Sequence, residues 1–127
     1  MDYFSKYFKN LSNKVSIVNT IHLKNLGKKN INIKKKNKKI LIFGNGGSIA
    51  IASHVAVDFA KNLNISISSY TDPSLLTCFS NDYKFENYIK KIIELYGEKG
   101  DMVILISSSG SSKNMIKPKS QTEICPF

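Results

Sequence analysis

The residues with the clearest potential for chemistry form a glycine-rich turn between an apolar run and a long apolar helix pattern. The turn, GNGGS, supplies Asn45, Gly46, Gly47 and Ser48. It follows the continuous run Ile40 to Phe43, which is typical of a strand buried on both faces of a parallel sheet. Backbone N–H groups at a helix N-terminus bind anions, and the Asn and Ser side chains add donors. The turn predicts a cradle for a small phosphate ester, with a tight connection alone as the alternative.

The glycine spacing differs from that of the common nucleotide-binding motifs. A dinucleotide site needs G-x-G-x-x-G, and a Walker loop needs a Lys followed by Ser or Thr. A second donor-rich loop, SSSGSS, follows the apolar run Met102 to Ile106 and supplies Ser107, Ser108, Ser109 and Ser112. Because the carboxyl ends of parallel strands lie along one edge of a sheet, the two loops are predicted to meet there. Either loop alone is a weak signal, but the pair predicts a phosphate-ester site.

Two further pairs of side chains carry possible chemistry. His54 and Asp58 are four residues apart in the helix pattern, so they share one helix face. Such a pair can ligate one divalent metal or move a proton, and an intrahelical hydrogen bond is the alternative. Asn81 and Asp82 lie in the polar segment SNDYK, where they either cap the next helix or reach sugar hydroxyls.

The elements that position these residues follow from apolar spacing. Apolar residues from Phe4 to Val18 recur every three or four positions, which predicts an amphipathic helix over residues 2–26 that covers the sheet edge or forms a subunit interface. The lysine-rich segment 27–38 is expected to be a solvated connector. After the first strand, Ser48 is the predicted N-cap of a helix that extends to Leu63.

The second half of the pattern alternates strands and helices. Residues 65–70 predict a strand, Asp72 and Pro73 predict the start of a short helix over 74–79, and residues 85–96 predict another helix that Gly97 ends. With the strand over 102–106 the order is βαβαβ. This order predicts an α/β fold with a parallel sheet, flanking helices and right-handed crossovers.

Composition restricts the class of protein. The 127 residues favour one domain, and the sequence has no apolar stretch long enough to span a membrane and no secretory signal, so we expect a cytoplasmic protein. The net charge is +10, but all 19 basic residues are Lys and 11 precede Ile40, which favours a solvated basic face over nucleic-acid binding. The spacing of Cys78 and Cys125 predicts ordinary reduced thiols.

Three motifs in this order resemble the sugar isomerase (SIS) domain and, within it, the phosphoheptose isomerases. They are GNGGS-x-A-x-x-x-H-x-A-x-D, then NDY, then I-S-x-S-G-x-S-x-N-x-I, and they cover the chain from about Ile40 to Ile116. The resemblance implies a flavodoxin-like sheet, a homotetramer with active sites between subunits, and interconversion of sedoheptulose 7-phosphate with glycero-manno-heptose 7-phosphate. In the family this step leads to the heptoses of lipopolysaccharide or capsule.

The resemblance also implies roles for individual residues. Positions 45–48 match the first substrate loop, positions 107–109 and 112 match the phosphate loop, and Asn81 with Asp82 matches a sugar-contacting pair. His54 matches a zinc ligand. Asp58 stands where the family usually has a Glu that ligates zinc and handles the proton, so its carboxylate reaches one methylene less far.

The chain departs from the resemblance after Ile116. Similar proteins continue with a helix, two strands and a C-terminal helix that supplies a Gln and a His to the zinc site. Here the tail 117–127 contains Pro118, which interrupts the expected helix. We therefore expect a partial, truncated SIS domain with an N-terminal helix over 1–26, a phosphosugar-binding core over 39–116 and an atypical tail. A non-catalytic SIS module that binds a phosphosugar or a protein partner is the alternative.

Overall fold

Three parallel strands in the order β2–β1–β3 form the centre of the fold. The computed structural model describes residues 2–120 of the chain. The central strand β1 (Ile40–Gly44) pairs with β2 (Ile67–Ser69) on one side and β3 (Met102–Ile106) on the other. The predicted α/β class, parallel sheet and two continuous apolar strands are confirmed. The strand β2 is shorter than the predicted 65–70.

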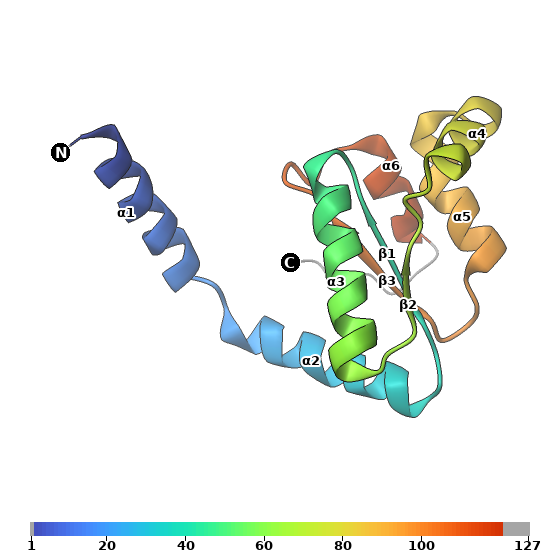
Figure 1. The fold of residues 1–127 in the computed structure, drawn as a ribbon, viewed down its shortest axis with the longest axis horizontal. Coiled ribbons are helices and arrows are strands. Elements are labelled where there is room, and N and C mark those ends of the chain that lie inside the picture. Colours follow the sequence, from blue (N-terminus) through green and yellow to red (C-terminus); the bar gives the residue numbers. More distant parts are fainter. Residues whose placement is uncertain (1, 121–127) are drawn as a thin grey trace.

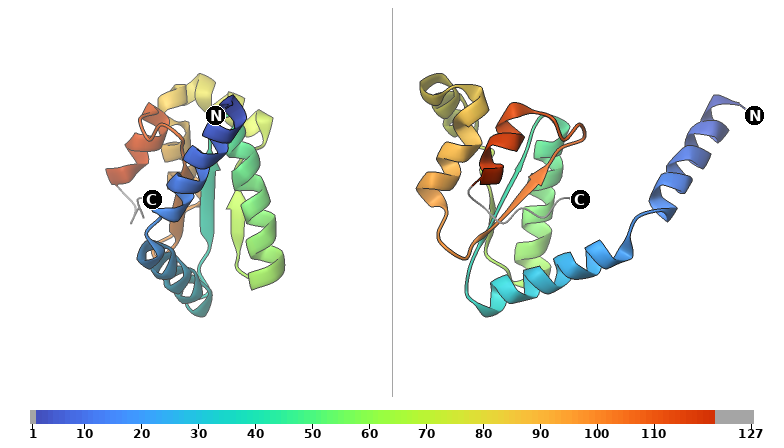
Figure 2. Two further views of the ribbon diagram at one scale, coloured as in Figure 1. Left: turned by 90° about the vertical axis from the view of Figure 1, so that its left-hand side faces the viewer. Right: turned by 180° about the vertical axis from the view of Figure 1, so that it is seen from behind.

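Helices cover both faces of this sheet (Figures 1 and 2). Helix α3 (Gly47–Leu63) lies on one face, and α5 (Tyr88–Tyr96) with the short α6 (Lys113–Ile116) lies on the other. Along β1, Ile40 and Ile42 pack in the cluster on the α3 side, while Leu41 and Phe43 pack in the cluster on the α5 side. Burial of both faces explains why β1 reads as an unbroken apolar run.

The N-terminal segment forms two helices, so the predicted helix over 2–26 is confirmed over 3–16 and 20–26 but is interrupted at 17–19, and the predicted loop over 27–38 is wrong for residues 27–35. These helices are α1 (Tyr3–Ser16) and α2 (Thr20–Lys35). The break occurs because Asn19 caps the second helix: its side chain accepts a hydrogen bond from the Ile21 N–H at 2.9 Å. Lysine favours helices, and Ile33 is buried in the core cluster on the α3 side, so the segment expected to be a connector is an anchored helix.

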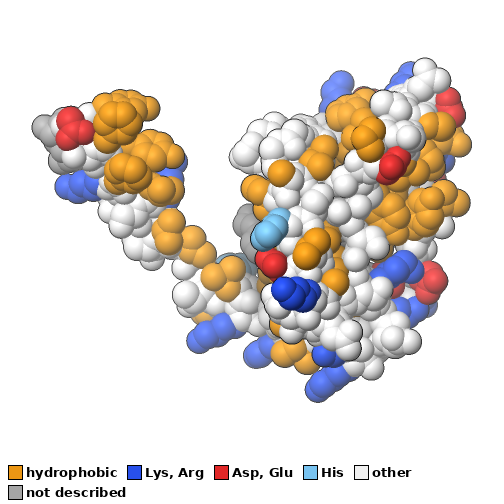
Figure 3. Space-filling view, viewed as in Figure 1, with side chains coloured by type: hydrophobic (Ala, Val, Ile, Leu, Met, Phe, Trp, Pro, Cys, Tyr) orange, Lys and Arg blue, Asp and Glu red, His pale blue; other side chains and the backbone are white. Residues whose placement is uncertain are grey.

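Helix α1 projects away from the sheet and has no buried residue (Figures 1 and 2). Its predicted apolar stripe is real but uncovered: Phe4, Phe8, Leu11 and Val15 are each at least 46% exposed. Figure 3 shows apolar side chains gathered along one side of this helix. A continuous apolar stripe at this exposure is unusual for a surface helix.

The segment after β2 contains α4 (Pro73–Tyr83), the 3₁₀ turn η1 (Phe85–Asn87) and α5. The predicted cap is confirmed, because the Asp72 carboxylate accepts hydrogen bonds from the Ser74 and Leu75 N–H groups at 2.8 and 3.1 Å. Helix α4 runs four residues past the predicted end at Phe79, so the polar break comes at Lys84, where φ is +68°. Gly97 follows the last residue of α5, as predicted.

The chain after α6 continues as a 3₁₀ turn, η2 (Lys117–Ser120). The α-helix stops at Ile116, before Pro118, in agreement with the predicted interruption. Of the two predicted thiols, Cys78 is free and exposed. Cys125 and the rest of the predicted tail from residue 121 lie outside the described residues.

A buried carboxylate joins the amino ends of β1 and β3. Asp101 accepts hydrogen bonds from the Lys39 and Glu98 N–H groups at 3.1 and 2.9 Å, and its Oδ2 lies 2.8 Å from the Lys39 ammonium nitrogen. Burial alone would raise the pKa of Asp101, but the hydrogen bonds from Lys39 and Glu98 outweigh it, so this pKa lies below its usual value. This contact fixes the end of the sheet opposite the donor-rich loops.

Candidate functional site

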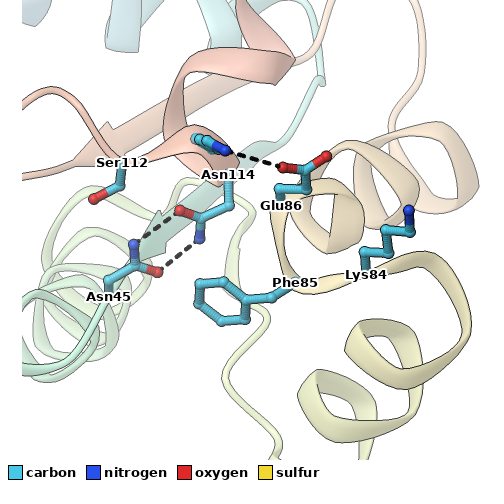
Figure 4. Close-up of a pocket in the computed structure, with 7 residues that line it drawn as sticks. Asn45, Lys84, Phe85, Glu86, Ser112 and Asn114 are labelled. Atoms are coloured by element: carbon cyan, nitrogen blue, oxygen red, sulfur yellow. Dashed lines mark hydrogen bonds and ion pairs between the residues drawn. The ribbon is translucent and has the colours of Figure 1, made fainter.

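The two donor-rich loops leave the sheet side by side. Strands β1 and β3 end at the paired residues Gly44 and Ile106, so the loops that follow begin as neighbours. A pocket of about 540 Å³ opens where they meet (Figure 4). Its lining residues come from the turn after β1, the turn after α4 and the start of α6: Asn45, Lys84, Phe85, Glu86, Ser112, Lys113 and Asn114. Two of the predicted site residues, Asn45 and Ser112, are therefore in one cavity.

The glycine-rich turn is shaped by two of its glycines. A Cβ on Gly44 would overlap the backbone of Ser48, so the strand and the helix approach closely here. Gly46 has φ +51° and is the N-cap of α3, so the prediction that Ser48 is the N-cap is wrong. Ser48 lies inside the first turn, and its N–H donates to the Asn45 carbonyl at 2.9 Å. The exposed Gly46 and Gly47 form the outer surface of the turn.

A pair of asparagines ties the first loop to α6. The Asn45 amide donates to Asn114 Oδ1 at 3.0 Å, and the Asn114 amide donates back to Asn45 Oδ1 at 2.8 Å (Figure 4). Asn114 is only 2% exposed. Burial raises the pKa of the neighbouring Tyr88 phenol, and a side-chain hydrogen bond with Asn114 acts in the opposite direction. Asn45 is half-buried and lines the pocket.

The serine loop closes on itself through its own hydroxyls. Ser107 Oγ accepts the Gly110 N–H at 3.1 Å, and Ser109 Oγ accepts the Ser111 N–H at 3.3 Å. A hydroxyl that accepts one hydrogen bond still has its own hydrogen to donate. Ser108 is exposed, and Ser112 precedes α6 and lines the pocket. The loop can therefore present several hydroxyl donors to an anion.

The opposite wall of the pocket is charged. Lys84, Phe85 and Glu86 come from the turn after α4 (Figure 4). The Lys117 ammonium donates to Glu86 Oε1 at 2.5 Å, and this hydrogen bond holds the pKa of Glu86 below its usual value. A second ammonium, that of Lys113, lies 4.0 Å from Glu86 Oε2.

Five lining residues were not predicted as site residues. Asn114 belongs to the third motif of the resemblance, but nothing in the sequence indicated its role in the pocket. Lys84, Phe85 and Glu86 reach the pocket through a turn whose geometry depends on the positive φ of Lys84, whereas Lys113 lines the pocket as the first residue of α6. No residue type in this turn indicates that geometry, because glycine is the residue that usually marks it.

Asn81 and Asp82 lie away from this pocket's lining. Both are exposed in the last turn of α4, and the Asn81 amide donates to Asp82 Oδ1 at 3.0 Å. They do not cap the following turn either, since η1 begins after Lys84 without a side-chain cap. Their predicted contact with a sugar stays a prediction.

His54 and Asp58 face outward from α3. Their side chains are 80% and 51% exposed, and His54 Nε2 lies 3.6 Å from Asp58 Oδ2. The i, i+4 spacing thus places both groups together, as expected from the sequence. Within residues 2–120, no cluster of three or more His, Cys, Asp or Glu side chains is arranged to hold a metal. Protein zinc sites use at least three protein ligands, so the described residues do not by themselves fit zinc.

Comparison with known proteins gives a consistent result. The SIS domain family model matches residues 3–122. The phosphoheptose isomerase of Fusobacterium nucleatum is 44% identical over 97 residues, which are 72% of this chain and 50% of that protein. Phosphoheptose isomerase 2 of Campylobacter jejuni is 41% identical over 101 residues, which are 75% of this chain and 50% of that protein. The chain spans about half the length of these curated relatives.

Two solved structures share the fold. A phosphoheptose isomerase from Neisseria gonorrhoeae superposes with a TM-score of 0.81 at 28% identity, covering 93% of this chain and 64% of that one. A phosphoheptose isomerase from Francisella tularensis gives a TM-score of 0.82 at 21% identity, covering 98% of this chain and 73% of that one. The second likeness concerns the fold alone.

Proposed function

This chain belongs to the SIS domain family, and from that premise we propose that it binds a phosphorylated sugar in the pocket between its glycine-rich and serine-rich loops. The relatives that are named phosphoheptose isomerase favour sedoheptulose 7-phosphate as the sugar. The observation that carries the proposal is the placement of Asn45 and Ser112 in one cavity beside adjacent strand ends.

The chemistry of the pocket suits a phosphate ester of a polyol. Its volume of about 540 Å³ lies within the range of small-molecule sites. The Ser112 hydroxyl can donate to a phosphoryl oxygen, and the two lysines of the lining, Lys84 and Lys113, outnumber its one carboxylate, Glu86. The amide of Asn45 can exchange hydrogen bonds with sugar hydroxyls. The lining therefore contains groups suited to a phosphoryl anion and groups suited to hydroxyls.

Aldose–ketose isomerisation adds a proton transfer to this binding. A base removes a proton next to the carbonyl, an enediolate forms, and the proton returns to the neighbouring carbon. By family position Asp58 is the candidate base. Its carboxylate is 51% exposed on the outer face of α3 and is not among the residues lining the pocket. This placement favours a second candidate function for the chain alone, namely phosphosugar binding without turnover.

Ligand titration of the 127-residue chain tests the binding proposal. Calorimetry with sedoheptulose 7-phosphate should show saturable binding, and sedoheptulose without the phosphate should bind at least about tenfold more weakly, because charge-assisted hydrogen bonds are lost. Ser112→Ala should weaken binding about tenfold for the same reason. Ser66→Ala is the matched control, because Ser66 is exposed at the other end of the sheet. Equal affinities for the two sugars would contradict the proposal.

Asp58→Ala separates the two candidate functions. If the protein is an isomerase, this variant should lose turnover of sedoheptulose 7-phosphate while its affinity for that sugar changes less than about threefold. If the wild-type chain binds the sugar but shows no turnover, binding alone is the function. A large loss of affinity in Asp58→Ala would place this carboxylate in the binding site instead.

The exposed stripe on α1 supports a further part of the proposal, that copies of the chain associate. A second copy with the same stripe is a matching partner for it, since two apolar faces exclude water from each other. The structure of the described residues contains no helix long and apolar enough to cross a bilayer. From the exposed stripe on α1 we propose a homo-oligomer in which α1 is a subunit contact.

A further inference from the structure

We propose that Asn114 is a positioning residue that fixes the orientation of the Asn45 carboxamide toward the sugar. The inference rests on the proposed function. Both asparagines line the pocket, but Asn114 is only 2% exposed, whereas Asn45 is half-buried and has more of its surface available to a ligand. The two side chains are 69 positions apart in the sequence and are joined by two hydrogen bonds.

The reciprocal pair determines what Asn45 can offer a ligand. A carboxamide has two N–H donors and a carbonyl oxygen with two lone pairs. One donor and one lone pair of Asn45 are used by Asn114. One N–H and one lone pair remain, with directions fixed by the pairing. This arrangement complements a sugar hydroxyl, which can accept a hydrogen bond from the free N–H and donate one to the free lone pair.

Asn114 is itself held in place from the other side. Tyr88, which is 2% exposed, makes a side-chain hydrogen bond with Asn114 and packs in the cluster on the α5 side of the sheet. The orientation of Asn45 is therefore supported by the core through Asn114. Without this partner, an isolated half-buried asparagine would rotate among several rotamers, and binding would have to order it.

The test compares sugar phosphate with inorganic phosphate as ligands. For Asn114→Ala in the full chain, we expect the affinity for sedoheptulose 7-phosphate to fall about tenfold or more, as for the loss of one or two hydrogen bonds. Affinity for inorganic phosphate should stay within about twofold, because the serine loop does not depend on this pair. The matched control is Asn30→Ala, since Asn30 is also a buried asparagine, at 6% exposure, but lies on α2.

Asn114→Asp supplies a second test that does not depend on removing the side chain. A protonated carboxyl can supply the one donor and one acceptor that Asn114 uses toward Asn45, whereas a carboxylate offers only acceptors. Burial beside Tyr88 should raise the pKa of this new carboxyl. The variant should therefore bind sedoheptulose 7-phosphate at least tenfold more weakly than wild type at pH 8. At pH 5 the difference in affinity between Asn114→Asp and wild type should narrow to about threefold, with wild type measured at both pH values.

The outcomes distinguish this inference from the proposed function. If the wild-type chain does not bind sedoheptulose 7-phosphate, the proposed function fails and the role of Asn114 fails with it. If wild type binds but Asn114→Ala binds equally well, or if both ligands weaken in parallel, only the positioning role is overturned. An affinity gap for Asn114→Asp that does not change with pH would also overturn it.

Discussion

Alanine substitutions at the three glycines of GNGGS should have three different effects, because each glycine meets a different constraint. Gly44 lies where a Cβ would overlap backbone atoms of Ser48 and would come within 2.8 Å of the Ile49 nitrogen. Gly46 has open space but a φ of +51°. Gly47 has open space and is the first residue of α3. The expected order of destabilisation is Gly44→Ala, then Gly46→Ala, then Gly47→Ala.

The magnitudes follow from these constraints. Backbone atoms of a strand and a helix cannot move aside without shifting β1 against α3, so Gly44→Ala should cost about 3 kcal/mol or more, at the upper end of overpacking effects. Gly46→Ala should cost about 1–2 kcal/mol, which is typical of a side chain forced to positive φ. Gly47→Ala should be neutral or stabilise by up to about 1 kcal/mol, because alanine favours the helix and restricts the unfolded chain.

Urea denaturation of the three variants measures these differences. The free energy of unfolding of each variant is extrapolated to zero urea, and the slopes of this free energy with urea concentration are compared. A variant with a changed slope has a changed unfolded state. Titration with sedoheptulose 7-phosphate then reports whether the shifted turn displaces Asn45. If Gly44→Ala is as stable as Gly47→Ala, the inference that the strand and the helix approach too closely for a side chain at Gly44 is wrong. A stable Gly46→Ala would show that the positive φ is not required.

Three further predictions concern other parts of the chain. Lys84→Gly should raise the free energy of unfolding by about 1 kcal/mol, because φ +68° with ψ 144° favours glycine, and a lower melting temperature would contradict this. Asp101→Asn should destabilise the fold by about 2 kcal/mol at pH 7 through loss of charge-assisted hydrogen bonds. Because the pKa of Asp101 is depressed in the folded state, its carboxylate stabilises the fold fully above about pH 4, and this stabilisation is lost as the pH falls further. The difference in unfolding free energy between wild type and Asp101→Asn should therefore shrink at low pH, as urea midpoints from pH 3 to 7 would show. Phe8→Lys with Leu11→Lys should lower the molar mass measured by light scattering, whereas Lys9→Glu should leave it closer to wild type.

Most of the sheet could be predicted because its strands are buried on both faces. The runs at β1 and β3 contain no polar residue to obscure them, and Asp72 with Pro73 marks the start of α4 in the usual way. The helical segment over 20–35 could not be predicted from its pattern. It is anchored by few residues, Asn30 and Ile33 being buried, and most of its other side chains are exposed. Tertiary contact, rather than local periodicity, decides its conformation.

The candidate site likewise contains residues that could be predicted from the sequence and residues that could not. Asn45 and Ser112 directly follow strands, so sheet topology brings them together and the sequence is sufficient to predict this. Lys84 and Glu86 reach the pocket only because the chain turns at a positive φ after α4. The pairing of Asn45 with Asn114 depends on how α6 packs beside β1, which no spacing rule gives.

Phosphate binding and proton transfer make different demands on this chain. Binding of a phosphoryl group needs hydroxyl and amide donors at the ends of neighbouring strands, and the loops after β1 and β3 carry such groups at Asn45 and Ser112. Proton transfer needs a base held close to the reacting carbon, with water excluded. His54 and Asp58 are paired but exposed to solvent on α3 and are not among the residues that line the pocket, and the same helix also exposes the apolar residues Ile51 and Val57. A surface that covers this face of α3, from a second copy of the chain or from further residues, would exclude water from His54 and Asp58. We therefore expect turnover to depend on such a covering surface, and phosphosugar binding not to depend on it.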